Sequence, residues 1–524
     1  MLTRLDCRGG PEARLAPAGE RGHDPDPMRS LALLAPIVAV IVGCPPPSEV
    51  EPLPEPGDWG PTLGPGLSSA PFAPEDLWNP CAYLDGGPED GDHHNLVTMY
   101  DGYLLMPWAP EWSHGGVSFF DVSDPCRPAK VGEAFIEAMR ESHSLSFSNI
   151  GGRFLAVDTH HTPTEGGVGF WDIDDPANPR WVGDVTVFGY GYPDAYARVT
   201  IQTFWQGPYL YVAGSDTGVY ILDARDPTDV VFMDVFNLDP PMRVGSFHVI
   251  GNRALMSTLE GARTALLDLS DPIAPQLLPG GEFQVVDSTG EERDYYFANV
   301  GGSYAMFARK EGAGGPILYD LSAPDVATYA FDHPTAGGNG GYVFLQGDDV
   351  FVGDSHWGAV IDVADPAATV ETGRAFLTGD LDTNTPLGHV MVLSVDDEAV
   401  PDQASAVVPW RVEPDTRGPR VGFTSPADGE VFVPLTGRVG VSFDEPVEPV
   451  SVFAGSLRVT TPDGAGVPGW FNAQENLVNF TPREPLLADT TYRVEIAAGG
   501  IVDASGNAAD PHTFRFSTGS EVTE

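Results

Sequence analysis

The chain has 524 residues, with 75 Asp or Glu against 27 Lys or Arg, which gives a formal net charge of −48 at pH 7. A negative field of this size repels nucleic acid and anionic lipid surfaces, so it argues against nucleic acid as a partner. We interpret the charge mainly as a solvated surface that keeps the protein soluble, and we expect a monomer.

The N-terminus has two parts. Residues 1–27 are polar and irregular, and we interpret them as an N-terminal extension that reflects a misassigned start. Residues 28–44 read MRSLALLAPIVAVIVGC, an apolar stretch too short for a comfortable membrane span and typical of a signal peptide. Its end, IVGC at 41–44, resembles the bacterial lipobox. That resemblance implies export, cleavage before Cys44 and acylation of Cys44; the alternative is an ordinary signal peptide that contains a cysteine.

A Pro-rich linker follows at 45–76, with ten prolines between residues 45 and 74. Such a composition favours an extended, semi-rigid spacer, as a tethered protein needs. Pro45 does not match the usual Asp retention signal of lipoproteins. We therefore expect an exported protein that is lipid-anchored at the outer membrane or cell surface.

One short pattern occurs six times in the middle of the chain. Each copy is an apolar run followed by Asp and, in most copies, by a second Asp and Pro, as in GGVSFFDVSDP at 115–125. Successive copies are 42 to 52 residues apart, a period typical of propellers and solenoids. The first Asp of each copy is Asp121, Asp172, Asp223, Asp268, Asp320 or Asp362.

The content of one repeat predicts a propeller blade. The unbroken apolar run indicates a strand buried on both faces, and the Asp-Pro pair that follows stops it. Upstream of the run, segments such as SLSFSNIGGRFLAVDT (144–159) predict a hairpin with a Gly turn. A worn seventh copy has a first hairpin at 388–400 and a third strand at 405–414. The sequence thus predicts an all-β chain with a seven-bladed β-propeller within 77–412.

These repeats resemble the LVIVD repeat family of bacterial and archaeal surface proteins. GGVSFFDVSDPCRP and TALLDLSDPIAP match its motif best, whereas Ala323 stands where the second Asp is expected. The resemblance implies a propeller at the cell surface. It supplies no catalytic residues, because the motif of the family is structural.

The segment 420–519 has a different character. GRVGVSFDEPV (437–447) and HTFRFSTG (512–519) alternate apolar and polar residues, which predicts half-exposed strands of a β-sandwich. Together with DASGNAA (503–509), they resemble the bacterial Ig-like domains of surface-layer and adhesin proteins. The resemblance implies a spacer or interaction module.

Two cysteines lie in the exported part beyond the lipobox. Cys81 precedes the first blade and Cys126 lies in its Asp-Pro turn. Because export favours disulfides, we expect these two to pair. Two isolated cysteines make a poor metal site.

A ring of polar residues is the one candidate site. Alignment of the blades places one residue per blade at the start of the innermost strand, around one mouth of the central channel. Arg in such a ring favours an anionic ligand, whereas His favours a transition metal, with loop residues His114, His160, His161 and His356 as further ligands. The third interpretation is structural, since these side chains also cap carbonyls or pair with nearby acids. The ring comprises His93 (or His94), His143, Arg198, Arg243, Arg293, Asn339 and His389.

The sequence has no GxSxG, P-loop, CxxC or EF-hand motif, and no motif requires a cofactor. We therefore expect an exported, membrane-anchored binding protein whose partner is a protein or glycan at the cell surface, or an anionic small molecule. The alternative is an enzyme, a metal-dependent oxidase or a lyase-type propeller, that acts at the ring.

Overall fold

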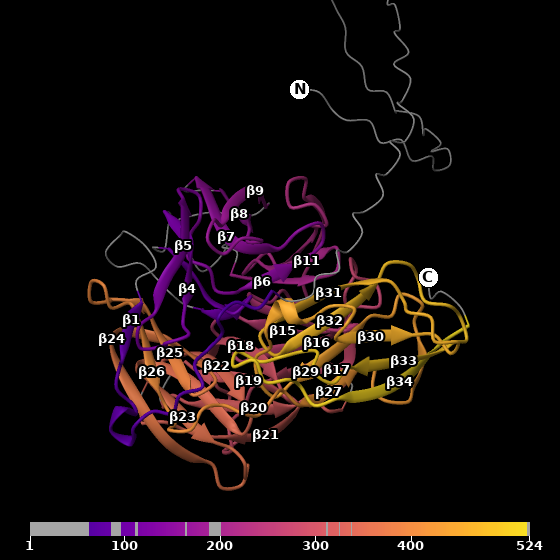
Figure 1. The fold of residues 1–524 in the computed structure, drawn as a ribbon. Coiled ribbons are helices and arrows are strands. Elements are labelled where there is room, and N and C mark those ends of the chain that lie inside the picture. The colour runs from indigo at the N-terminus through magenta and orange to yellow at the C-terminus, as the bar shows by residue number, and fades with distance from the viewer. Residues whose placement is uncertain are drawn as a thin grey trace, which may run out of the picture. The chain divides into compact units, whose positions relative to one another are not determined.

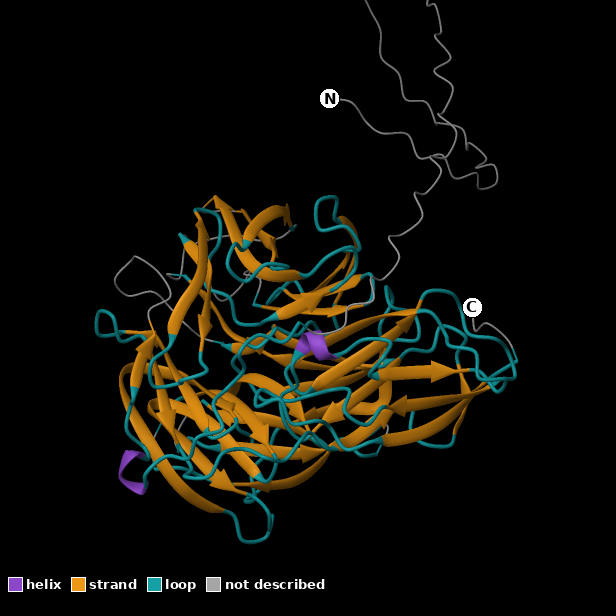
Figure 2. Cartoon of the chain, viewed as in Figure 1, coloured by secondary structure: helices purple, strands orange, loops and turns teal. Residues whose placement is uncertain are grey.

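In the computed structural model, strands dominate the described part of the chain, whose helices are two short 3-10 turns, η1 (Pro74–Asp76) and η2 (Pro449–Ser451) (Figure 2). By their contacts, residues Leu53–Glu524 make up one unit. Among the described residues, no helix is long and apolar enough to cross a membrane. The extension, the signal peptide with Cys44 and most of the linker lie outside the described residues. Those residues are 62–84, 96–109, 114–162, 165–187, 201–310, 313–323, 325–336 and 338–520.

Five four-stranded antiparallel sheets follow one another along the chain as blades 1 to 5 (Figure 1). In each blade the strands pair in sequence order, A to D. The strands are β2 (Thr98–Tyr100), β3 (Tyr103–Trp108), β4 (Gly115–Asp121) and β5 (Ala129–Ile136); β6 (Ser146–Ser148), β7 (Phe154–Thr162), β8 (Glu165–Asp172) and β9 (Arg180–Thr186); β10 (Gln202–Gln206), β11 (Tyr209–Ala213), β12 (Val219–Asp223) and β13 (Val231–Phe236); β14 (Val244–Ile250), β15 (Arg253–Thr258), β16 (Arg263–Asp268) and β17 (Gln276–Gln284); β18 (Tyr295–Gly301), β19 (Tyr304–Arg309), β20 (Pro316–Asp320) and β21 (Thr328–Asp332).

Blades 6 and 7 are joined in one sheet of order β1-β26-β25-β24-β23-β22. β23 supplies both strand B and strand C of blade 6. The two halves lie side by side, since the N–H of Val363, after strand C, donates to the carbonyl of Asp348, before strand B, at 2.8 Å. Leu269 and Asn252 make the equivalent bond in blade 4, at 2.7 Å. β24 supplies strand D of blade 6 and then strand A of blade 7. The bounds are β22 (Gly340–Gln346), β23 (Asp349–Asp362), β24 (Val370–Leu387), β25 (Val390–Asp397) and β26 (Ser405–Pro409).

The N-terminal strand β1 (Ala82–Leu84) completes the ring. It pairs antiparallel with β26 as the outermost strand of blade 7, so the first and last blade strands of the chain lie in one sheet. The described residues thus form the predicted seven-bladed propeller. The disulfide Cys81–Cys126, with 5.0 Å between the Cα atoms, joins the residue just before β1 to the Asp-Pro turn of blade 1.

The first hairpin of blade 7 differs from the expectation. The segment 388–400 contains strand B (β25), and strand A lies upstream in β24, where residues 380–387 pair with β25. Strand A reads DLDTNTPL, which is too polar to be recognised as a buried strand. The expected third strand is β26.

The repeated Asp residues build the turns after strand C. The side chain of the first Asp accepts the backbone N–H two residues on, at 2.9 Å in Asp121, 2.7 Å in Asp268 and 2.9 Å in Asp362, and equivalently in the other three copies. The second Asp does the same where it is present, as in Asp271 at 3.0 Å. Such side-chain turns fix the chain reversal, so the repeat is a folding signal.

Burial falls from the channel to the rim of each blade. The A strands β10, β14, β18 and β22 are buried throughout, whereas the D strands β13 and β17 are mostly exposed. This gradient is what inner strands packed between neighbouring blades require. Because strand D is mostly exposed, it needs no apolar run and is the strand that the sequence marks least.

The C-terminal domain is a sandwich of two four-stranded sheets, as predicted. Their orders are β27-β29-β32-β31 and β28-β34-β33-β30, and the core between them includes Val441, Phe480, Val494 and Phe514. The strands are β27 (Val421–Ser425), β28 (Glu430–Val433), β29 (Val439–Phe443), β30 (Leu457–Thr460), β31 (Gly469–Gln474), β32 (Leu477–Pro482), β33 (Thr491–Ile496) and β34 (His512–Thr518).

Candidate functional site

The A–B turns of the blades lie on one face of the propeller, which we call the bottom face; the opposite face, where the A strands begin, is the top face. Most A–B turns carry a glycine at positive φ, for example Gly251 at 60°. Five of these glycines donate their backbone N–H to the C-terminal domain. The pairs are Gly102 to Glu448 Oε2 (3.2 Å), Gly207 to Asn472 Oδ1 (2.7 Å), Gly251 to Asn479 Oδ1 (2.8 Å), Gly302 to the Phe443 carbonyl (2.6 Å) and Gly347 to the Asp444 carbonyl (2.7 Å).

The two remaining turns also meet this domain. Asn472 Nδ2 donates to the Phe147 carbonyl of blade 2 at 2.9 Å. In blade 7 a Cβ on Gly388 would lie 2.3 Å from Ser505 Oγ. Every blade therefore contacts the C-terminal domain through its A–B end, and the bottom face is occupied. The top face is where a partner would have access, so the candidate site belongs there.

His143 is the best-defined ring residue at the top face. Its Nε2 lies 2.9 Å from Glu141 Oε1, and the two side chains are 6% and 7% exposed. The His143 ring packs against Phe297, with 5.1 Å between the ring centroids. Phe297 in turn stacks on Tyr342 at 4.3 Å, and the Tyr342 hydroxyl donates to the His143 carbonyl at 3.2 Å. Aromatic side chains thus fill the channel beside this histidine.

The two described arginines of the ring are ion-paired. Arg243 Nε lies 2.8 Å from Asp216 Oδ1, and Arg293 bonds both Asp287 and Glu291. Burial alone would raise the pKa of Asp287, but hydrogen bonds from Thr289 and Arg293 lower it well below its usual range.

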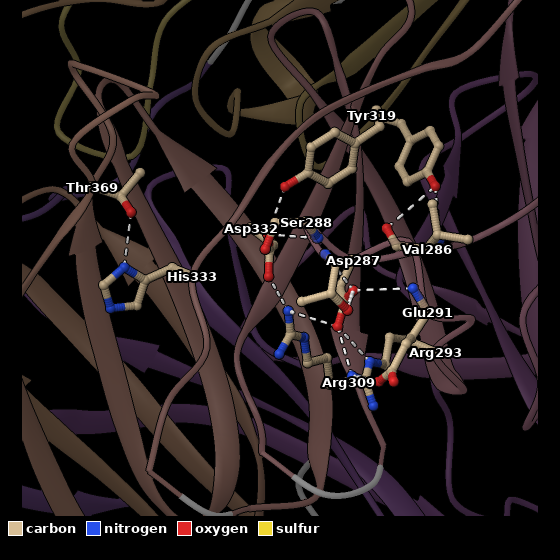
Figure 3. Close-up of polar contacts among 12 residues, drawn as sticks. Val286, Asp287, Ser288, Glu291, Arg293, Arg309, Tyr319, Asp332, His333 and Thr369 are labelled. Carbon is tan, nitrogen blue, oxygen red and sulfur yellow. Dashed lines mark hydrogen bonds and ion pairs between the residues drawn. The ribbon is translucent and has the colours of Figure 1, made fainter.

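Arg293 belongs to a wider network between blades 4 and 5 (Figure 3). Arg309 Nη2 lies 4.0 Å from Asp287 Oδ2 and also bonds Asp332. The Tyr329 hydroxyl and the Ser288 N–H both donate to Asp332 Oδ1, at 2.5 and 3.1 Å. The network locks the 285–294 connection onto blade 5, which is a structural role.

The other ring and loop positions make separate local contacts. The Asn339 N–H donates to Ser355 Oγ at 2.9 Å, His356 Nδ1 donates to the Gly379 carbonyl at 3.0 Å, and His114 Nε2 lies 2.6 Å from Glu137 Oε2. In the described part of the chain, no set of three or more His, Cys, Asp or Glu side chains that includes a histidine brings its ligand atoms within 4.8 Å of one another. His93, His94 and Arg198, and the side chains of His160 and His161, lie outside it.

His389 is placed differently from the expectation. It lies between β24 and β25, in the A–B turn of blade 7, and its Nε2 donates to the Ala70 carbonyl at 3.2 Å. It therefore belongs to the bottom face. The cause is the polar strand A of blade 7, since aligning on the apolar β25 shifted this blade by one strand.

Sequence reasoning missed the acid beside His143. Asp158, in β7, is fully buried, and burial raises its pKa to about 7 against the attraction of Arg140 and His143. Arg140 and Glu141 are also buried. The available signal was a single Asp within the apolar run FLAVDT. We call Arg140, Glu141, His143 and Asp158 the channel cluster.

Residues 415–518 match the family model described as the bacterial Ig-like domain. The C-terminal sandwich is a bacterial Ig-like domain. The contact that each blade makes with the C-terminal domain at the bottom face is thus a contact with an Ig-like domain. No curated protein matches the chain.

Several solved structures resemble the chain at low identity. They include a periplasmic gluconolactonase from Pseudomonas aeruginosa (11% identity, TM-score 0.44, 59% of this chain and 86% of that one). A protein from Lactobacillus plantarum gives 13% identity and a TM-score of 0.45, over 62% of this chain and 98% of that one. A putative 6-phosphogluconolactonase from Bacteroides fragilis is 12% identical with a TM-score of 0.43, and the match covers 59% of this chain and 96% of that one. At these identities and TM-scores, the likenesses say nothing of what this chain does.

Proposed function

We propose that the chain is an exported, lipid-anchored binding protein of the cell surface, and that it recognises its partner at the top face of the propeller. The observation that carries the proposal is the position of the Ig-like domain, which occupies the A–B turns. A bacterial Ig-like domain is consistent with a surface protein. In this arrangement the bottom face of the propeller binds the Ig-like domain of the same chain, and the top face binds the partner.

The leader supports the location. The lipobox-like IVGC with Cys44 accounts for a lipid anchor, and the Pro-rich linker accounts for the distance between the anchor and the folded unit. The resemblance to LVIVD repeats also supports a location at the cell surface.

The partner is a protein or glycan of the cell surface, or an anionic small molecule. Arg243 is 37% exposed and Arg293 is 29% exposed, so both present guanidinium surface in a chain of net charge −48. Arg binds carboxylate and phosphate groups with paired donors. Because Asp216 and Asp287 already hold these arginines, we propose that a ligand competes for, or adds to, existing ion pairs.

The second candidate function is enzymatic, and the channel cluster favours it. Glu141 pairs with the buried His143 at 2.9 Å, and the pKa of the nearby buried Asp158, which the charges of Arg140 and His143 stabilise, is about 7, within the range of a general acid or base. Of the two enzymatic alternatives, a lyase-type reaction would use these groups as acid and base. Buried ion-pair networks shift pKa values in the same way without catalysing anything.

Binding measurements on matched variants separate the two functions. The chain from residue 45 onward is tested on glycan arrays and on whole cells, as the natural sequence, as Arg243→Ala, which removes a half-exposed arginine of the top face, and as the control Arg515→Ala, an exposed arginine of the Ig-like domain. Loss of binding in Arg243→Ala alone, at unchanged Tm, supports top-face recognition. Equal binding by all three proteins contradicts it. Turnover of a substrate that requires His143 would favour the enzyme.

A further inference from the structure

Three carboxyl groups that are distant in sequence meet where the propeller passes into the Ig-like domain. Asp415 lies in the linker after β26, Glu445 follows β29, and Asp503 lies in the loop before β34. One carboxylate oxygen from each lies within 4.8 Å of the other two. The side chain of Asp415 is 6% exposed, and residues Glu445 and Asp503 are 2% and 3% exposed.

Two of the three carboxyl groups are held by the protein. Asp503 Oδ1 accepts the backbone N–H groups of Ser505 and Asn507 at 2.8 Å each. Asp415 Oδ1 pairs with Arg411 Nη2 at 2.9 Å. These contacts orient the two side chains and leave Glu445 as the group that they do not satisfy.

Glu445 Oε1 is buried and has no hydrogen-bond partner. Ser505 Oγ, in the same loop as Asp503, is a second buried oxygen without a partner. An unpaired carboxylate is costly to bury, and two further carboxylates beside it increase that cost. Such a group requires either a proton or a cation.

The donor set favours one kind of cation. It consists of oxygens alone, with no His or Cys, which suits a hard ion and disfavours zinc or copper. Oxygens that bind one Ca²⁺ at about 2.4 Å can lie up to about 4.8 Å apart, whereas Mg²⁺ requires shorter distances and a stricter octahedron. The separation of the three carboxylates therefore fits calcium with little rearrangement.

We propose that Asp415, Glu445 and Asp503 bind a calcium ion at the junction between the propeller and the Ig-like domain. The ion neutralises the three carboxylates and ties the interdomain linker to the 501–509 loop. That loop packs on the A–B turn of blade 7, since a Cβ on Gly388 would lie 2.3 Å from Ser505 Oγ and 3.5 Å from Asp415 Cβ. Calcium thus strengthens the attachment of the Ig-like domain to the bottom face.

The test uses the chain from residue 45 onward, which contains the whole of the compact unit Leu53–Glu524. Calcium binding is followed by titration calorimetry, and Tb³⁺ binding by luminescence sensitised through Trp410, whose Nε1 donates to the Gly388 carbonyl at 3.0 Å. We expect one calcium site with a dissociation constant of about 0.1–1 mM, in the range of extracellular modules. The natural protein is compared with Glu445→Gln and with the control Glu484→Gln, an exposed residue of the same domain.

Glu445→Gln should weaken binding by about tenfold or more, since it removes one of three charged ligands. In EDTA its Tm should equal or exceed that of the natural protein, because the substitution relieves repulsion between carboxylates. That result separates a lost ligand from a lost fold. Glu484→Gln should bind like the natural protein. Absence of binding at about 10 mM calcium, or an unchanged affinity in Glu445→Gln, would overturn the proposal.

Discussion

Arg438 of the Ig-like domain donates from Nη1 to the Gln206 side chain of blade 3, with 2.8 Å between Nη1 and Oε1. Its Nε and its backbone N–H both donate to Asn252 Oδ1 of blade 4, at 3.2 and 2.9 Å, and its Nη2 donates to the Leu269 carbonyl. Arg438 is 3% exposed. One buried guanidinium therefore joins the Ig-like domain to the A–B ends of two neighbouring blades.

Arg438→Ala should destabilise the protein by about 3 kcal/mol, because it leaves several buried acceptors without a donor. The measurement is urea unfolding, together with the rate of proteolysis in the linker 411–420. Arg515→Ala, at an exposed position of the same domain, is the control and should leave both unchanged. Equal stability of the two variants would show that Arg438 does not hold the domain to the propeller.

Gly251→Ala should cost more than Gly290→Ala, although both glycines have positive φ, 60° and 81°. A Cβ on Gly251 would lie 2.4 Å from the Ser425 carbonyl oxygen of the Ig-like domain, whereas a Cβ on Gly290 meets nothing within 4 Å. We expect a loss of about 1 kcal/mol for Gly290→Ala from backbone strain and about 3 kcal/mol for Gly251→Ala, measured by urea unfolding. Similar losses at the two positions would argue against close docking at blade 4.

Stability should depend on pH through Glu448. Burial raises the pKa of Glu448 to about 7, although the N–H groups of Asp101 and Gly102, at 2.7 and 3.2 Å, favour its ionised form. Below the pKa of about 4.5 in the unfolded chain, both states hold the proton and pH has no effect. Between about pH 4.5 and about pH 7, only the folded state keeps the proton on Glu448. The free energy of unfolding therefore falls as pH rises through this range, by up to about 3 kcal/mol.

The Glu448 prediction is checked by urea unfolding at pH 5 and pH 8 in EDTA. The natural protein should lose more stability between the two values than Glu448→Gln, which cannot titrate. Glu475 and Asp158, whose pKa values burial also raises to about 7, contribute the same sign in both proteins. An identical pH dependence in the two proteins would be inconsistent with a raised pKa at Glu448.

Loss of the Cys81–Cys126 disulfide should destabilise the propeller. The bond closes a loop with a sequence separation of 45 residues and holds β1, the outermost strand of blade 7, to blade 1. Chain entropy gives about 4 kcal/mol for a loop of this length. Urea unfolding of Cys81→Ser/Cys126→Ser tests the value, and intact mass before and after reduction tests the bond. Two free thiols in the untreated protein would contradict it.

The sequence predicted the parts of the fold that repeat. The Asp of each turn is visible because its side chain performs the same local task in every blade, and the apolar runs mark the buried C strands. Blade 7 was misaligned because its strand A is polar and therefore lacks the apolar pattern that marks a buried strand. The error moved His389 to the wrong face.

The candidate site was less predictable, because contacts between distant segments decide it. Nothing local to Gly207 or Gly302 indicates that its N–H donates to a domain more than 100 residues away. Alignment of the blades identified His143 but not Asp158, which lies near His143 because β7 is in the same blade. Asp415, Glu445 and Asp503 likewise meet only through the packing of the linker against the Ig-like domain.

The mass of the native N-terminus tests the central functional claim most directly. The chain is produced from its own leader in a Gram-negative host, recovered from membranes, and its N-terminal peptide is analysed by mass spectrometry. We predict that the mature chain begins at Cys44, that this residue carries acyl groups, and that Cys44→Ser releases the protein from the membrane. A soluble protein that retains residues before Cys44, or an unmodified Cys44, would contradict an exported, lipid-anchored binding protein.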